Sequence, residues 1–246
     1  MKIIECQQSS QRWHAARLGI PTASRFAAIV TPKGAAVTGK ARHTYMMELL
    51  AERILGRAKE CYISKDMERG TRLEPEAREW YESCYGEDVE QVGFAMSNSG
   101  HYGASPDGLI GHDRCMEIKV PTVQNHIAHL VADKVPTHWQ VQIQGELWVC
   151  ERDECQFVMY CDDEKVPSMV KLVGRDPAVI DALAVNVPMF CAELDEAEKF
   201  MRQRYEMEPR EVIELDGLSG DWCPFDMGNG DAAWVPTETT ESEESK

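Results

Sequence analysis

Between residues 40 and 56, apolar positions recur at helical spacing and the segment ends on a glycine, a pattern that predicts a helix. A second helix is predicted to open at Glu74, because Pro75 would take the first helical position, which proline favours. Three further segments have helical periodicity, and Pro188 is expected to kink the last of them. They are residues 123–133, 137–150 and 177–204.

Short segments rich in apolar and β-branched residues lie between these helices and predict strands. Turn sequences such as Ser-Asn-Ser-Gly and Gly-His-Asp-Arg separate several of them. The order of helices, a cluster of strands, then helices, strands and a helix favours an α/β (α+β) fold with one mixed central sheet flanked by helices. The predicted strands are residues 89–96, 101–104, 109–110, 115–120, 155–161 and 168–173.

The chain has 246 residues, 43% of them hydrophobic, which suits one domain with a substantial core over residues 1–215. Residues 216–246 are richer in Gly, Pro, Ser, Thr and acids, and we expect a flexible acidic tail there. This tail contains Trp222, Phe225 and Trp234. These aromatic residues could dock a partner or fold back onto the domain, and the sequence favours neither.

The formal net charge is −16, which argues against a broad nucleic-acid-binding surface but leaves room for a local basic site. No apolar run approaches the roughly 18 residues of a membrane span. The first residues turn polar too early for a secretory signal. We therefore expect a soluble, cytoplasmic protein without a membrane partner.

Nine cysteines are scattered without a C-x-x-C pair, which argues against a zinc ribbon or a disulfide framework. Most have apolar neighbours, so buried thiols are expected. An iron–sulfur site is not suggested by the spacing, although the spacing does not exclude one.

The segment SPDGLIGHDRCMEIKV, residues 105–120, contains the most informative chemistry. Asp107 lies in a tight Ser-Pro-Asp-Gly turn. Strand alternation places Glu117 and Lys119 on one face, about 7 Å apart, with Ile118 on the other. A plain surface hairpin with an exposed salt bridge would also fit, and would contribute little to stability. However, the charged residues interrupt an otherwise apolar strand, where charges need a purpose.

Carboxylates from a turn and from the adjacent strand can converge on a hard divalent cation such as Mg²⁺. The carbonyl of Ile118 could add an oxygen ligand, and Lys119 could orient or deprotonate an attacking water. The cation would offset charge that develops on a phosphate. The acid…acid-x-Lys order of Asp107, Glu117 and Lys119 is typical of metal-dependent nucleases with a restriction-endonuclease-like core.

Two other regions could complete such a site. Glu74 could add a carboxylate, or could simply favour a helix N-terminus. In the helix of residues 137–150, Gln140 and Gln144 lie four apart, and at least one of them is expected to face a polar site. His126 and His129 could bind a transition metal, but a solvated helix face is the favoured interpretation.

A phosphate pocket is predicted nearer the N-terminus. Thr22 and Ser24 precede an apolar run and resemble a helix start, whose free N–H groups bind phosphate. Arg17 could add a bidentate contact. Capping of the helix by Thr22 or Ser24 is the simpler alternative.

Five short motifs, in this order, resemble the phage lambda-type alkaline exonucleases, also called YqaJ-like viral recombinases. They begin with the segment from Trp13 to Ser24, and together they span residues 13 to about 205. The others are Gly70-x-x-x-Glu74, Ser105-Pro-Asp107-Gly, Glu117-Ile-Lys119 and Gln142-Ile-Gln144 followed by Trp148. Related nucleases of the RecB type have Gln-x-x-x-Tyr where this chain has Gln144 and Trp148, which leaves Trp148 without a hydroxyl role.

The resemblance implies a restriction-endonuclease-like fold and degradation of linear double-stranded DNA by a processive 5′-to-3′ exonuclease. The family releases mononucleotides, leaves a 3′ single-stranded overhang, forms a homotrimer ring around DNA and acts with a single-strand annealing protein in phage recombination. Two Mg²⁺ ions are implied, with Mn²⁺ able to substitute.

The resemblance also implies residue roles. Asp107, Glu117 and the Ile118 carbonyl would bind metal, with Glu74 as a nearby acid. Lys119 and Gln144 would position the attacking water. The substrate's 5′-phosphate would be held by Arg17, Ser24 and Ser105, with Thr22 beside them.

Two alternatives remain open. A structure-specific endonuclease could use the same core and would cut closed circular DNA. A non-catalytic scaffold could dock a recombination partner through the tail, although the intact acids and lysine argue against it.

Overall fold

The computed structural model describes residues 1–58, 64–210, 215, 225–226 and 232–233. Most of the predicted tail, with Trp222 and Trp234, lies outside these residues; the described part includes one antiparallel pair, β8 (Phe225–Asp226) and β9 (Ala232–Ala233).

The main sheet is mixed and has the order β4-β5-β6-β7. Its strands are β4 (Gly108–Ile110), β5 (Arg114–Lys119), β6 (Glu154–Met159) and β7 (Met169–Gly174). The pair β5–β6 is parallel, with Glu117 opposite Phe157, and the other two pairs are antiparallel. Parallel neighbours need a long crossover, which α4 (Val123–Ala132) and α5 (Thr137–Val149) supply.

The sequence pattern predicted that all strands join one central sheet, and this prediction is wrong. Three of them form a separate antiparallel sheet in the order β1-β2-β3. They are β1 (Lys2–Ile4), β2 (Phe94–Met96) and β3 (Gly103–Ala104). The predicted strand 89–96 is also shorter than expected, and only an isolated bridge from Glu90 to Leu109 links its first part to the main sheet.

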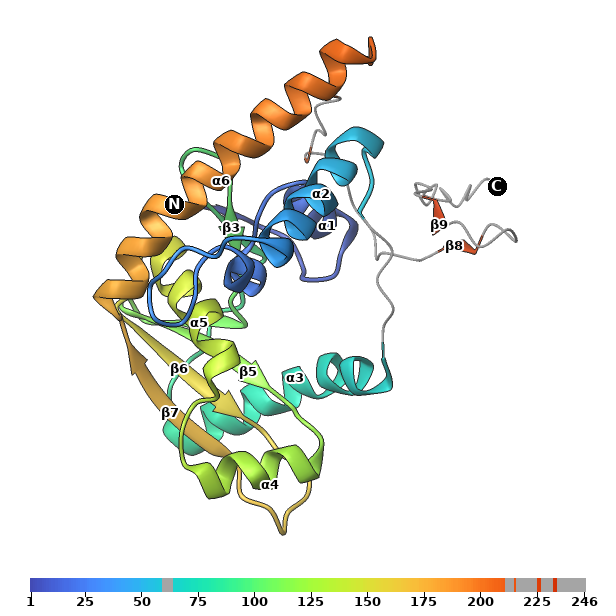
Figure 1. Ribbon diagram of the computed structural model, residues 1–246. Helices are drawn as coiled ribbons and strands as arrows, with labels where there is room; N and C mark the ends of the chain where they lie inside the picture. The colour runs from blue at the N-terminus through green and yellow to red at the C-terminus, as the bar shows by residue number, and fades with distance from the viewer. Residues whose placement is uncertain (59–63, 211–214, 216–224, 227–231, 234–246) are drawn as a thin grey trace, which may run out of the picture.

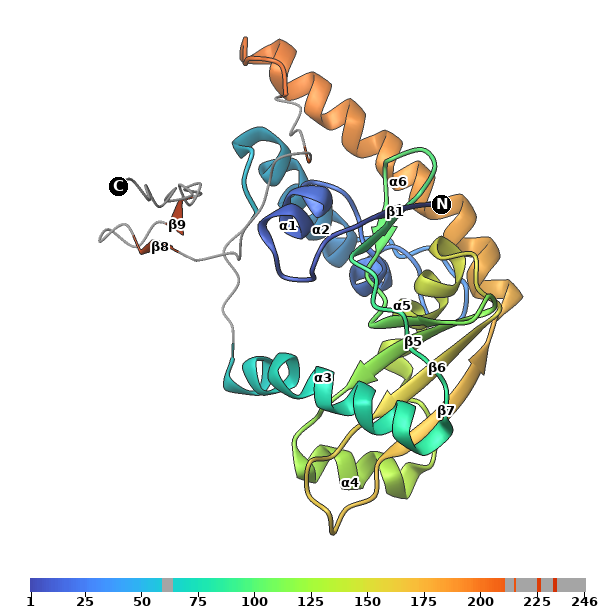
Figure 2. The same cartoon turned by 180° about the vertical axis from the view of Figure 1, so that it is seen from behind.

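Helices cover both faces of the main sheet. Figure 1 shows α4 and α5 in front of β5–β7, and the reverse view in Figure 2 shows α3 (Lys65–Tyr85) across the other face. Met116 and Ile118 of β5 pack in a cluster with Ala77 and Tyr81 of α3. Cys115, on the opposite face of β5, packs with Ile143 and Leu147 of α5. The alternation of β5 therefore separates an apolar face from a face that contacts α5.

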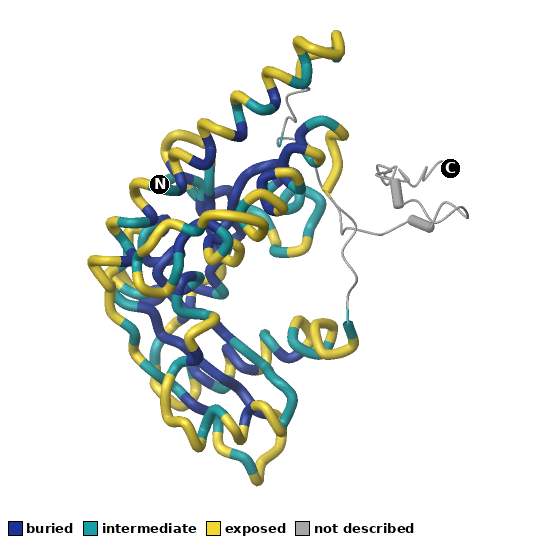
Figure 3. Tube along the Cα trace, viewed as in Figure 1, coloured by how far each residue is buried: buried dark blue, intermediate teal, exposed yellow. Residues whose placement is uncertain are grey.

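A second part of the core lies around α2 (Lys40–Leu55), the 3₁₀ helix η1 (Ala23–Ala28) and α6 (Pro177–Arg204). The short helix α1 (Gln11–Arg17) packs next to β2. Figure 3 shows the buried residues gathered in the sheets and the helices against them, while the last turns of α6 are largely exposed. Of the described helices, α6 is the only one long and apolar enough to span a bilayer, but Leu183, Phe190 and Leu194 are fully buried, as in a core helix.

One predicted helix start needs correction. Glu74 does not begin a helix: α3 starts nine residues earlier, at Lys65, and the capping Ser64 side chain accepts a hydrogen bond from the Met67 N–H at 3.2 Å. Pro75 lies inside α3 and removes one backbone donor without ending it. Pro188 also lies inside its helix, α6, which is continuous from Pro177 to Arg204, and the kink expected there stays a prediction. Helix 40–56 is confirmed, with Gly56 as its left-handed cap.

The seven described cysteines are all free, and five of them are buried, as expected from their apolar neighbours.

Candidate active site

The centre of the site is the face of β5 that points toward α5. Glu117 is 1% exposed, and the Nζ atom of Lys119 forms an ion pair with its Oε1 atom. Both side chains lie on the face opposite Ile118, as strand alternation predicts. The Glu117–Lys119 pair is therefore part of the interior between sheet and helix, and the surface-hairpin interpretation is wrong.

The turn before β4 holds Asp107 beside this pair. The Asp107 N–H donates to the Met116 carbonyl at 2.9 Å, and Asp107 Oδ2 accepts from the Ile118 N–H at 2.6 Å. Arg78 of α3 donates to the Asp107 carbonyl at 3.1 Å and 3.3 Å. These bonds fix both the backbone and the carboxylate of Asp107. Because the Ile118 N–H faces Asp107, the Ile118 carbonyl faces the same edge of β5.

Glu74 reaches the same region from the middle of α3. Its Oε1 atom lies 3.8 Å from Nη2 of Arg78, one helical turn away. Its negative charge is one of the causes that raise the pKa of Asp107. The structure thus brings Asp107, Glu117, Lys119 and Glu74 together, although Glu74 comes from a helix interior.

The site holds more negative than positive charge. Burial raises the pKa of Asp107 well above its ordinary value, Glu117 and Glu74 raise it further, and Lys119 opposes the shift. Burial disfavours the charge of Lys119, but Glu117 and Asp107 outweigh that effect and raise its pKa. Converging oxygen donors that repel one another fit a hard divalent cation, which would relieve the repulsion.

Gln142 of α5, and not Gln144, contacts these carboxylates. Its Nε2 atom donates to Glu117 Oε1 at 2.6 Å and to Glu146 Oε1 at 2.9 Å. Gln144 instead donates to the Gly174 carbonyl at 2.9 Å and accepts from the Asp176 N–H at 2.8 Å. The expectation that Gln144 positions a water at the carboxylates is therefore wrong, because residues two apart on a helix point in different directions.

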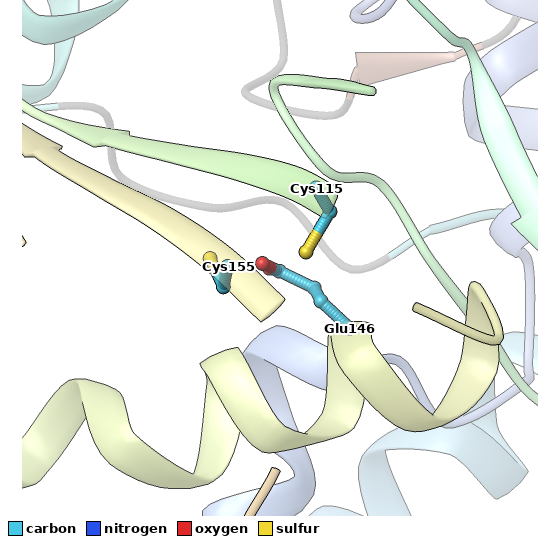
Figure 4. A group of neighbouring side chains, drawn as sticks. All are labelled: Cys115, Glu146 and Cys155. Atoms are coloured by element: carbon cyan, nitrogen blue, oxygen red, sulfur yellow. The ribbon is translucent and has the colours of Figure 1, made fainter. Parts of the chain in front are cut away.

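A second group that could hold a metal ion lies behind Glu117. Figure 4 shows a carboxylate oxygen of Glu146 pointing between the thiols of Cys115 and Cys155, and the ligand atoms of these residues lie within 4.8 Å of one another. All three residues are buried, and burial raises the pKa of Glu146 well above its usual range. Two thiols would favour a thiophilic ion over Mg²⁺.

Two of the residues predicted to hold a phosphate, Arg17 and Ser105, lie in contact. Nη1 of Arg17 donates to Ser105 Oγ at 3.2 Å, and Trp13 Nε1 donates to the same oxygen at 2.9 Å. The Arg17 guanidinium stacks on the Trp13 ring at 3.8 Å. Burial lowers the pKa of Arg17 to about 10, which leaves it cationic at neutral pH. Since Ser105 is two residues from Asp107, this pocket is directly connected to the carboxylates.

Thr22 and Ser24 do not start an α-helix. They lie at η1, a six-residue 3₁₀ helix without a side-chain cap. The Thr22 N–H donates to the hydroxyl of Tyr45 at 3.1 Å, and Thr22 Oγ1 lies 3.3 Å from Ser24 Oγ. Thr22 also bridges to Gly103, two residues before Ser105. The structure therefore places Thr22 beside the strand that leads to Ser105, with Ser24 exposed, and the helix that starts here is a 3₁₀ helix.

Comparison with known proteins explains this arrangement. Residues 12–153 match the YqaJ-like viral recombinase domain. The chain belongs to this family. An alkaline exonuclease from Laribacter hongkongensis, LHK-Exo, has 33% sequence identity to this chain and a TM-score of 0.73. The match covers 80% of this chain and 98% of that chain. The structure of LHK-Exo in complex with dAMP matches this chain with the same identity, coverage and TM-score. No curated protein sequence matches.

A phage-related exonuclease from Haemophilus somnus 129PT shares the fold, at 15% identity and a TM-score of 0.57 over 74% of this chain and 96% of that one. The fold is therefore that of the alkaline exonucleases, the restriction-endonuclease-like fold. Membership of the YqaJ-like family supports a nuclease in recombination.

The histidines and the tryptophan singled out in the sequence pack against other residues of this YqaJ-like domain. His126 is fully buried and its Nε2 atom is 2.9 Å from the Pro167 carbonyl, so the solvated-face interpretation is wrong for it. His129 packs near the rings of His138 and Trp139. Trp148 stacks on Tyr102 with centroids 4.6 Å apart.

Sequence reasoning missed Gln142, Glu146 and the bond from Trp13 to Ser105. One signal was present: Gln142 and Glu146 are four apart on a predicted helix, so their side chains share a face. The Trp13 contact crosses 92 residues and has no local signal.

Proposed function

We propose that this chain is a Mg²⁺-dependent, processive 5′-to-3′ exonuclease on linear double-stranded DNA. It releases mononucleotides and leaves a 3′ single-stranded overhang for single-strand-annealing recombination. The observation that carries the proposal is the convergence of Asp107, Glu117 and Lys119 beside the pocket of Arg17 and Ser105.

The metal ligands would be Asp107, Glu117 and the carbonyl of Ile118, with Glu74 close by. Two Mg²⁺ ions suit this set, and Mn²⁺ would substitute because it also accepts oxygen ligands. Bound cations supply charge that offsets the negative charge growing on the phosphate. Asp107 needs little rearrangement for this role, since its carboxylate is already fixed by the Ile118 N–H.

Lys119 would act as a hydrogen-bond donor. Because its neighbours raise its pKa, its Nζ atom keeps its proton at neutral pH and can orient the attacking water toward the phosphate. Gln142 takes the place that Gln144 was expected to fill. By donating to Glu117 Oε1, it holds that carboxylate in one orientation.

The terminal 5′-phosphate would be held by Arg17 and Ser105, with Trp13 supporting the guanidinium and Thr22 and Ser24 at the rim. Arg17 provides charge-assisted hydrogen bonds. A pocket only two residues from Asp107 supports removal of short products from the 5′ end, because a phosphate bound there lies close to the metal ligands.

Processivity fits a homotrimer ring that encloses the duplex. A chain with a net charge of −16 would repel DNA from most of its surface, so inward-facing Lys and Arg would supply the phosphate contacts. A single-strand annealing protein would take the 3′ overhang. The chain would act in the cytoplasm of a phage-infected or lysogenic bacterium.

The test is a cleavage assay on 5′-labelled linear and closed circular duplexes, with and without Mg²⁺. The proposal expects label release from the linear substrate as mononucleotide, dependent on Mg²⁺ and faster with a 5′-phosphate. The circle should stay intact. Cutting of the circle would favour a structure-specific endonuclease, and no cleavage of either substrate would favour a non-catalytic scaffold.

A further inference from the structure

Glu146 is a buried acid whose presence the proposed ligand set does not explain. It projects from α5 and is 1% exposed, with Ile143 and Leu147 in the same buried layer between helix and sheet. Placing a carboxyl group in such surroundings is unfavourable unless its oxygens have partners. The partner of its Oε1 atom is the feature that suggests a role.

Gln142 lies between Glu146 and Glu117. Its single amide nitrogen donates to Glu146 Oε1 at 2.9 Å and to Glu117 Oε1 at 2.6 Å. An amide NH₂ group has two hydrogens, so one serves each carboxyl group. With an acceptor on both sides, only the NH₂ end of Gln142 fits there, and this fixes the orientation of the amide.

We propose that Glu146 is a positioning residue for the nuclease reaction. It anchors Gln142, and Gln142 in turn holds the Glu117 carboxylate toward Asp107. Without Glu146 the amide can rotate, and Glu117 loses a charge-assisted hydrogen bond that restricts its rotation. This inference rests on the proposed function, because Glu117 is a metal ligand only in that proposal.

The other oxygen, Oε2, has no hydrogen-bond partner among the described residues. A carboxylate oxygen of Glu146 lies near the thiols of Cys115 and Cys155 (Figure 4). Weak donors on that side leave Oε1 as the oxygen with a strong contact. Gln142 is therefore the amide link from Glu146 to Glu117, whose nearby charge also raises the pKa of Glu146.

Two substitutions separate positioning from packing. Glu146→Leu keeps a similar volume, suits the apolar surroundings and removes the acceptor. Glu146→Gln keeps an acceptor oxygen for Gln142. Val141→Ala is the matched control, because Val141 is a fully buried residue of the same helix in a different cluster.

Each variant is assayed for kcat and KM on linear duplex, for the Mg²⁺ concentration at half-maximal rate, for calorimetric Mg²⁺ binding without DNA, and for Tm. We expect Glu146→Leu to lower kcat about 10- to 100-fold and to weaken Mg²⁺ binding, with KM and Tm preserved. Glu146→Gln should retain most of the wild-type kcat. Val141→Ala should lower Tm alone.

Wild-type kcat and Mg²⁺ binding in Glu146→Leu would overturn the proposal. So would one equivalent of zinc in the purified protein that is lost in Cys115→Ser, because Glu146 would then be a metal ligand. Failure of the proposed function looks different: the wild type itself would not cleave DNA with Mg²⁺, while the calorimetric comparison would still test the link from Glu146 to Glu117.

Discussion

The two glutamines of α5 provide a sharp test of the site geometry. They are two residues apart on the same buried helix and have the same side chain, yet Gln142 contacts Glu117 and Gln144 contacts the backbone of residues 174 and 176. Gln144 is buried and Gln142 is partly buried, and replacing either with leucine removes two hydrogen bonds. The structure predicts that Gln142→Leu slows cleavage, whereas Gln144→Leu lowers stability and leaves cleavage fast.

For Gln142→Leu, one lost bond orients Glu117, the proposed metal ligand, and comparable supporting contacts are worth about 10- to 100-fold in activity. By the relation of about 1.4 kcal/mol per tenfold, this is roughly 1.4 to 2.7 kcal/mol of transition-state stabilisation. For Gln144→Leu, the Gly174 carbonyl and the Asp176 N–H lose their partner. Both residues are exposed, so water can replace these contacts; at about 0.5–1.5 kcal/mol for each lost hydrogen bond, the free energy of unfolding should fall by about 1–3 kcal/mol.

The assay is single-turnover cleavage of linear duplex at saturating Mg²⁺, paired with urea unfolding of each variant. Gln142→Leu should be slow even when it is fully folded, and Gln144→Leu should be less stable but fast once folded. A slow, fully stable Gln144→Leu together with a fully active Gln142→Leu would refute the placement of these residues.

Three further outcomes are expected. The Arg53 side chain is 3% exposed and forms ion pairs with Asp195 at 2.6 Å and Glu198 at 3.2 Å. Arg53→Met should therefore lower the free energy of unfolding, measured in urea, by about 3–5 kcal/mol. An unchanged midpoint of urea unfolding would contradict this. Burial, with a smaller contribution from Arg17, lowers the pKa of His14 to about 4. Between about pH 6.5 and pH 4 the unfolded chain therefore binds more protons than the folded one, and stability is lost as the pH falls through that range. His14→Gln should flatten the dependence of Tm on pH, and parallel curves for variant and wild type would contradict this. Because burial and neighbouring acids raise the pKa of Asp107, Mg²⁺ binding should release protons, which calorimetry in buffers of different ionisation enthalpy detects as buffer-dependent heats.

Much of the fold follows from local patterns, and its exceptions have local causes. The helix of residues 40–56 and the strand of residues 115–120 are close to their predicted bounds, because periodicity reports which face is buried. The start of α3 was misplaced because Pro75 was taken as the mark of the helix start, whereas Ser64 caps the N-terminus of the helix. The division into two sheets depends on β1 pairing with β2 across about 90 residues, and short-range patterns do not encode such pairing.

The site was predictable where backbone geometry decides it. Turn chemistry and strand alternation place Asp107, Glu117 and Lys119 together. The choice between Gln142 and Gln144 was not predictable in this way, because it depends on how α5 is rotated about its axis against β5. That rotation is set by the packing of residues such as Ile143 and Gly145. At Gly145 a Cβ atom would lie 2.7 Å from the ring of Phe26, so only glycine lets α5 pack this closely.

The central claim is that the cluster around Lys119 performs the cleavage. Its most direct test is Lys119→Ala, measured for cleavage and for DNA binding on the same 5′-phosphorylated linear duplex. We predict a loss of at least about 100-fold in single-turnover rate with DNA affinity unchanged, because in the proposed function Lys119 orients the reacting water while Arg17 and Ser105 hold the end. Full activity in Lys119→Ala would contradict the account.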